Sequence, residues 1–76
     1  MSENAIVQMV RERDEALLSL DREKLAAYAA KYGVALPDDE SVFWLGIHKA
    51  RCHAMSLPQE ARDESERWLK ERGSKP

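Results

Sequence analysis

The side chains best suited to chemistry in this sequence lie together in residues 42–55, VFWLGIHKARCHAM. If this stretch is helical, His48 and Cys52 stand one turn apart, a spacing that can place both on one metal ion. A closed zinc site needs four ligands, however, and the other histidine, His53, projects from a different side of the helix. We therefore expect neither a bound metal nor a cofactor.

His48 and Cys52 also form the pair that nucleophilic catalysis uses, a thiol beside an imidazole base. Catalysis of this kind needs a third group that orients the base, and a pocket that holds the substrate. The sequence offers no identifiable orienting group, and the two residues lie on one predicted helix. We therefore interpret them as polar or half-buried helix positions, and we expect no enzymatic activity.

Basic side chains on the same helix favour a further interpretation, contact with nucleic acid. A short helix with two to four donors is the minimum for reaching into a duplex groove. The acidic run 38–40 stands at the N-terminal end of this helix, and 12 basic and 14 acidic residues give the chain a net charge of −2. Nucleic-acid binding is therefore the alternative function and not the expected one. Its donors would be His48, Lys49, Arg51 and His53.

Hydrophobic periodicity predicts helices, and no strand, to position these side chains. Apolar residues recur at three- and four-residue steps, and no long stretch alternates with period two. The predicted fold class is all-α: a compact four-helix domain over residues 1–73 and a disordered tail at 74–76, with the third and fourth helices as the tightest pair. The helices are expected near residues 4–18, 20–32, 39–55 and 57–72.

Residues with strong capping preferences mark the ends of these helices. Ser56 and Gln59 have the spacing of a capping box, and Pro58 suits the first turn of a helix. The expected start and stop residues are Ser19 and Gly33 for the second helix, Asp38 or Asp39 for the start of the third, and Ser56 and Gly73 for the fourth.

One face of each helix is expected to be buried. Gly46 is small and flanks the predicted core arc of the third helix, so the fourth helix can approach closely there over a two- or three-residue turn. The stripe of the first helix comprises Ile6, Met9, Val10, Arg13, Ala16 and Leu17, and the core arc of the third comprises Phe43, Ile47, Ala50 and Ala54.

Apolar residues outside these faces predict a binding surface. Val7 and Leu18 lie far around the first helix from its stripe, and a domain of 76 residues has too few elements to cover both sides of its helices. We expect an apolar patch with a polar edge that binds another protein or a second copy of the chain. Its residues would be Val7, Leu18, Val42 and Leu45, with His48 and Lys49 at the rim.

Three segments of the sequence resemble small proteins encoded by tailed bacteriophages and prophages. They are LSLDREK, KYGVALPDDESVFWLGIHKAR and WLKERG, and the likeness extends from about Val10 to Gly73. The resemblance implies a phage gene product in the cytoplasm of a bacterial host, with a host or phage protein as its partner, and it implies no activity. The sequence agrees with a cytoplasmic location, because we find no secretory signal in it. Its apolar runs are also far shorter than the about 20 residues that a membrane span needs.

Overall fold

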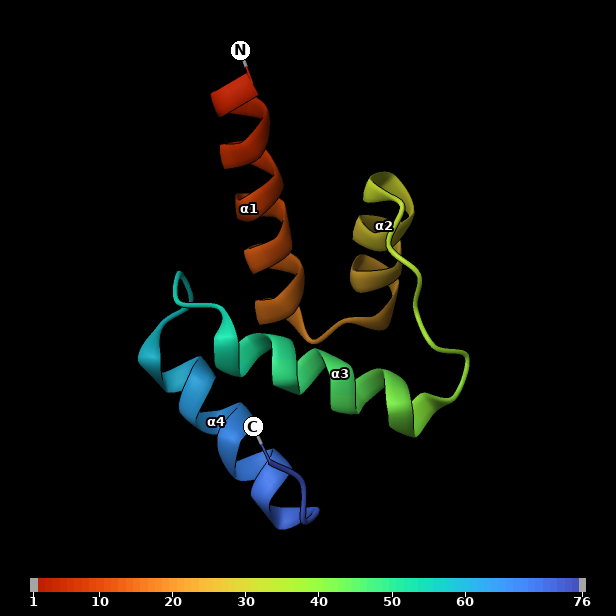
Figure 1. Cartoon of the computed structure of the whole chain (residues 1–76), viewed down its shortest axis with the longest axis vertical. Helices are drawn as coiled ribbons and strands as arrows, with labels where there is room; N and C mark the ends of the chain where they lie inside the picture. The colour runs from red at the N-terminus through yellow and green to blue at the C-terminus, as the bar shows by residue number, and fades with distance from the viewer. Residues whose placement is uncertain (1, 76) are drawn as a thin grey trace. The chain divides into compact units, whose positions relative to one another are not determined.

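The computed structural model describes residues 2–75, with side chains from Asn4 to Lys75. Figure 1 shows the four helices in this part of the chain: α1 (Ser2–Ser19), α2 (Arg22–Tyr32), α3 (Glu40–His53) and α4 (Gln59–Glu71). The described residues contain no strand, so the predicted all-α fold is confirmed. Within the same range, no helix combines the length and apolar character that a membrane crossing requires.

The chain divides between Ala35 and Leu36 into two compact units. The first unit contains α1 and α2, and the second contains α3 and α4, which form the more extensive helix pair. The prediction that α3 and α4 are the tightest pair is therefore confirmed. A single domain over residues 1–73 stays a prediction. Of the tail at 74–76, Ser74 is held by a hydrogen bond from its amide to the Leu69 carbonyl at 2.9 Å, and Pro76 lies outside the described residues.

Asp21 caps α2, so the prediction of Ser19 as the cap is wrong. The Asp21 carboxylate accepts hydrogen bonds from two amides of the first turn at 2.8 and 3.2 Å. Ser19 ends α1 instead, because its hydroxyl donates to the Ala16 carbonyl at 2.6 Å and accepts from the Asp21 amide at 3.1 Å. Leu20 lies between them with a φ of 50°. The carboxylate wins the cap because an ionised acceptor at the positive end of a helix binds amides more strongly than a hydroxyl does.

The buried face of α1 is shorter than its apolar stripe. Ile6 and Met9 are 58 % and 37 % exposed, so the expectation that they are buried is wrong. The reason is length, because α1 has 18 residues and α2 has only 11 with which to cover it. The core residues of this unit are Ala16 and Leu17 on α1 and Leu25 and Ala29 on α2.

The core face of α3 is rotated toward His48 and Arg51 relative to the prediction. Both residues are buried, whereas Ala50 and Gly46 are exposed. Among the described residues, a Cβ at Gly46 would meet no atom within 4 Å beyond its own helix, so α4 does not approach closely there. Asp39 caps α3 as predicted, through a 3.1 Å bond from the Val42 amide to its carboxylate.

The predicted capping box does not start α4. Pro58 occupies the cap position and provides no side-chain cap, while the Gln59 side chain donates to Asp63 at 2.8 Å. The connection from α3 spans residues 54–58 and is longer than predicted. It forms a turn, closed by a 2.9 Å bond from the Leu57 amide to the Ala54 carbonyl, that buries the Leu57 side chain.

Candidate functional site

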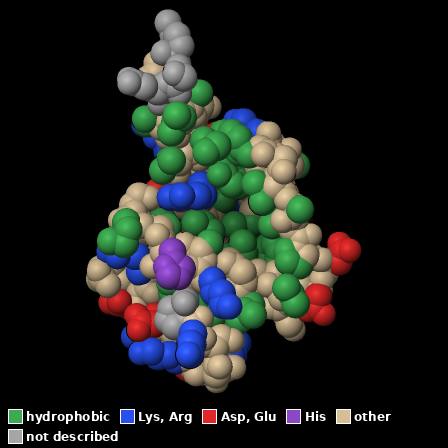
Figure 2. Space-filling model, viewed as in Figure 1, with side chains coloured by type: hydrophobic (Ala, Val, Ile, Leu, Met, Phe, Trp, Pro, Cys, Tyr) green, Lys and Arg blue, Asp and Glu red, His purple; other side chains and the backbone are tan. Residues whose placement is uncertain are grey.

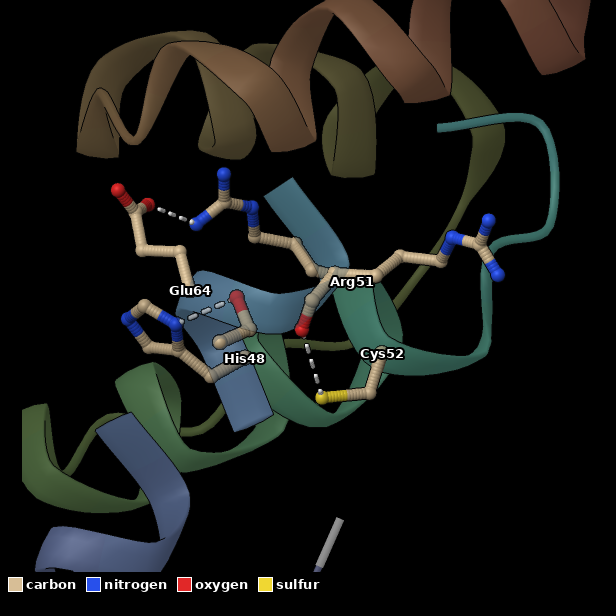
Figure 3. Close-up of polar contacts among 6 residues, drawn as sticks. His48, Arg51, Cys52 and Glu64 are labelled. Atoms are coloured by element: carbon tan, nitrogen blue, oxygen red, sulfur yellow. Dashed lines mark hydrogen bonds and ion pairs between the residues drawn. The ribbon is translucent and has the colours of Figure 1, made fainter. Parts of the chain in front are cut away.

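His48 joins α3 to α4 inside the second unit. Its Nδ1 lies 2.9 Å from the Ser65 hydroxyl, and its ring stacks on Trp68 with centroids 4.0 Å apart and planes 14° from parallel. Figure 3 shows the imidazole turned toward α4. The residue is 5 % exposed, so the prediction that His48 lies at the rim of an exposed surface is wrong. The physical reason is that α4 packs on the His48 side of α3.

Arg51 makes the second link between α3 and α4. Its Nη1 donates to Glu64 Oε1 at 3.0 Å, and the arginine side chain is 3 % exposed while that of the glutamate is 56 % exposed (Figure 3). With His48 and Arg51 both buried, only Lys49 and His53 of the predicted basic side are exposed. Figure 2 shows acidic, basic and hydrophobic side chains together on the face in view. The arrangement therefore weakens the nucleic-acid interpretation.

The surroundings of His48 favour its neutral form. Burial, together with the positive charges of Arg51 and Arg72, lowers the pKa of His48 from its ordinary value of 6.5, and the Glu64 carboxylate partly opposes this effect. A buried imidazole with a hydroxyl partner and a stacked indole is a packing element as well as a base.

Cys52 does not share a site with His48. Its Sγ lies 3.8 Å from the Arg62 carbonyl oxygen, and Figure 3 shows the two side chains directed to different partners. Burial raises the pKa of the Cys52 thiol, which disfavours the reactive thiolate. Among the described residues, no three His, Cys, Asp or Glu side chains are grouped in a way that could hold a metal ion.

An open groove of about 420 Å³ lies between the start of α3 and the end of α4. Val42, at its edge, is 50 % exposed, and the two tryptophans are half-buried. Apolar side chains thus supply the walls, and one acidic and one basic group stand beside them. The residues lining this α3–α4 groove are Glu40, Ser41, Val42, Trp44, Leu45, Trp68, Arg72 and Ser74.

Polar contacts hold both tryptophans of the groove in place. The Trp44 indole nitrogen donates to Glu40 Oε1 at 2.8 Å. Trp68 stacks on His48, and the Arg72 guanidinium carbon lies 3.8 Å from the indole centroid while Nη1 donates to the Trp68 carbonyl at 3.2 Å. These contacts restrain both indoles, and a restrained side chain loses less entropy when a partner binds.

The structure brings together two of the six residues predicted for a binding surface. Val42 and Leu45 line the groove, whereas Lys49 is exposed on α3 outside it. Val7 and Leu18 are 56 % and 43 % exposed on α1, in the other unit. His48 does not line the groove, but its ring stacks on Trp68, which does.

The binding surface predicted from the sequence did not include Trp44, Trp68 or Arg72, which line the groove. The two tryptophans were detectable, because indoles of a domain this small are hard to bury completely. Arg72 carried no comparable signal, since it follows the last turn of α4 and reaches Trp68 by folding back.

The first unit has a polar surface cluster of its own. Glu12 of α1 accepts hydrogen bonds from Lys31 Nζ at 2.6 Å and from the Tyr32 hydroxyl, both of α2. The bond from Lys31 lowers the pKa of Glu12, and the bond to Glu12 raises the pKa of Tyr32. An open pocket of about 330 Å³ adjoins this cluster, with charged residues on much of its wall. This arrangement links the two helices and offers less apolar surface than the groove.

Comparison of the chain with protein-family models, curated proteins and solved structures found no match in any of the three. The resemblance to phage and prophage proteins therefore stays a prediction, and the function is argued from the geometry of the groove.

Proposed function

We propose that this protein is a small interaction module of the phage type, acting in the bacterial cytoplasm, that binds another protein through the α3–α4 groove. The observation that carries the proposal is the presence of Val42, Leu45 and two ordered tryptophans on one open groove. Tryptophan is enriched among the residues that contribute most binding energy at protein interfaces, and an apolar centre with a polar edge is their usual anatomy.

The partner class follows from the shape and lining of the groove. The walls come from two helices of one hairpin, and the groove is partly open to solvent. A groove of this kind accepts the apolar face of a peptide segment or helix. Glu40 and Arg72 at its edge provide one charge of each sign for orientation. A host or phage protein, or a second copy of the chain, fits this description.

The test compares the same substitution, valine to aspartate, inside the groove and outside it. Val42 lines the groove and is 50 % exposed, and Val34 lies outside it and is 49 % exposed. Val42→Asp puts a carboxylate into the first turn of α3, where the helix dipole favours it, so the fold is retained. Val34→Asp is the matched control, and Leu45→Asp is a second groove variant.

Two measurements use these variants. The mass of the protein is determined in solution over a range of concentrations, and immobilised protein then captures partners from a bacterial lysate. We expect wild type and Val34→Asp to bind the same partner, or to self-associate, with equal strength. Val42→Asp and Leu45→Asp should bind about tenfold more weakly or worse, a loss of ~1.4 kcal/mol. A wild-type monomer that captures nothing, with groove variants behaving identically, would refute the proposal.

A further inference from the structure

His48 is buried whereas His53 is exposed, and the charges around His48 are unevenly balanced. Two cations face it, Arg51 on α3 and Arg72 at the end of α4, and one carboxylate, Glu64 of α4. That carboxylate is itself half exposed and already paired with Arg51. A proton on the imidazole would therefore add a third positive charge to a site that already has two cations and one carboxylate.

Protonation would also change the contacts that His48 makes with α4. The neutral ring can accept from or donate to the Ser65 hydroxyl at Nδ1, but the imidazolium can only donate. Ser65 is fully buried, so the contact between its hydroxyl and His48 Nδ1 is shielded from water. The stacked Trp68 lies directly on the ring and lines the groove. A change at His48 is thus transmitted to a groove wall through one contact.

We propose that His48 is an acid-sensitive latch, whose protonation loosens α3 from α4 and disorders the Trp68 wall of the groove. The loosening rests on the burial of His48 and on the two arginines that face it, and it needs no partner. Its consequence, weaker partner binding in weak acid, rests on the proposed function of the groove.

The direction of the pH dependence follows from linkage. Burial and the two arginines lower the pKa of His48 in the folded protein, so the unfolded chain binds the proton more readily. The stability contributed by the neutral ring is therefore complete above the ordinary value of 6.5. It is lost as the pH falls from that value through the lowered pKa of the folded state.

The experiment compares substitutions of the two histidines. His48→Gln keeps a side chain that can hydrogen-bond to Ser65 but cannot titrate, and His53→Gln removes the exposed histidine as a matched control. Urea unfolding is followed by tryptophan fluorescence at about pH 7.5 and about pH 5, on either side of the ordinary histidine range. Both tryptophans, Trp44 and Trp68, belong to the second unit, so the emission reports this helix pair and needs no partner.

We expect the urea midpoint of wild type and of His53→Gln to fall on acidification, and that of His48→Gln to fall clearly less. NMR titration of wild type is the second measurement and does not depend on how well a variant folds. There, His48 should titrate below the ordinary histidine value of 6.5, and the Trp68 ring resonances should move with it. An equal midpoint shift in His48→Gln, or a His48 titration that leaves Trp68 unchanged, would overturn the latch. Neither result depends on the capture experiment, so the two proposals fail separately.

Discussion

At the scale of single residues, the second unit is unusual for placing three polar side chains inside a thin core. His48, Arg51 and Ser65 are all buried, and Ser65 is fully so. The Nε of Arg51 is buried with no hydrogen-bond partner within the described part of the chain. Polar groups in such positions stabilise a fold only while their partners are present.

Removing the Ser65 hydroxyl tests this dependence. Ser65→Ala keeps the close approach of the helices but takes away the partner of His48 Nδ1, which lies 2.9 Å away. A buried polar atom left without its partner costs about 1–3 kcal/mol, so we expect a loss of stability of that size in urea unfolding followed by tryptophan fluorescence. Ser41→Ala, at an exposed position of α3, should change stability by less than about 0.5 kcal/mol. Equal effects of the two substitutions would show that the His48 contact contributes nothing.

At the scale of helices, the ends of each element are fixed by backbone conformation as much as by side chains. Gly33 has a φ of 68°, and the Val34 amide beyond it bonds back to the Ala29 carbonyl at 2.8 Å. Gly46 has the opposite character, because it lies inside α3, is exposed, and has open space where a Cβ would stand. One substitution should therefore have opposite effects at these two positions.

Replacing each glycine by alanine measures both effects. Gly33→Ala forces a side chain into the left-handed region and should destabilise the protein by about 1–2 kcal/mol. Gly46→Ala should stabilise it by roughly 0.5–1 kcal/mol, because alanine loses less backbone entropy than glycine in a helix interior. Circular dichroism during urea unfolding reads both changes. A stabilising Gly33→Ala would mean that α2 ends differently in solution, and a destabilising Gly46→Ala would mean that something packs against this side of α3.

At the scale of the whole molecule, the two units differ in the size of their cores. The buried apolar residues of the first unit include two alanines and two leucines, whereas the second unit buries larger groups and a phenylalanine. Hydrophobic stabilisation grows by about 0.8 kcal/mol for each buried methylene, so the second unit has the larger share of it. Its buried apolar residues are Phe43, Ile47, Ala54, Leu57, Ala61 and Leu69.

The aromatic residues allow the two units to be followed separately. Tyr28 and Tyr32 lie in the first unit, and both tryptophans lie in the second. In a urea titration we expect the tyrosine ring resonances in NMR spectra to lose native dispersion at lower urea than the tryptophan fluorescence changes. Coincident transitions would instead support one cooperative domain over residues 1–73, as the sequence predicts.

The sequence by itself determined the four helices and some of their ends. Periodicity located α1 to α4, and Gly33 and Asp39 marked a stop and a start correctly, because these signals act within one turn of the backbone. The prediction that Ser19 caps α2 was wrong although a cap is an equally local signal, because the Asp21 carboxylate two residues later is a stronger acceptor. Val42 and Leu45 were identified as outward-facing apolar residues from the same periodicity.

Only the tertiary structure decided which face of each helix is covered. The direction from which α4 approaches α3 buried His48 and Arg51 and left Ala50 exposed. It also placed Trp68 and Arg72 beside Val42, which lies 26 and 30 positions before them in the chain. A helical pattern specifies which residues share a face, but the azimuth of a neighbouring helix depends on the fit of side chains from both. For this reason the groove, and the histidine behind it, could be located only once α3 and α4 were seen packed together.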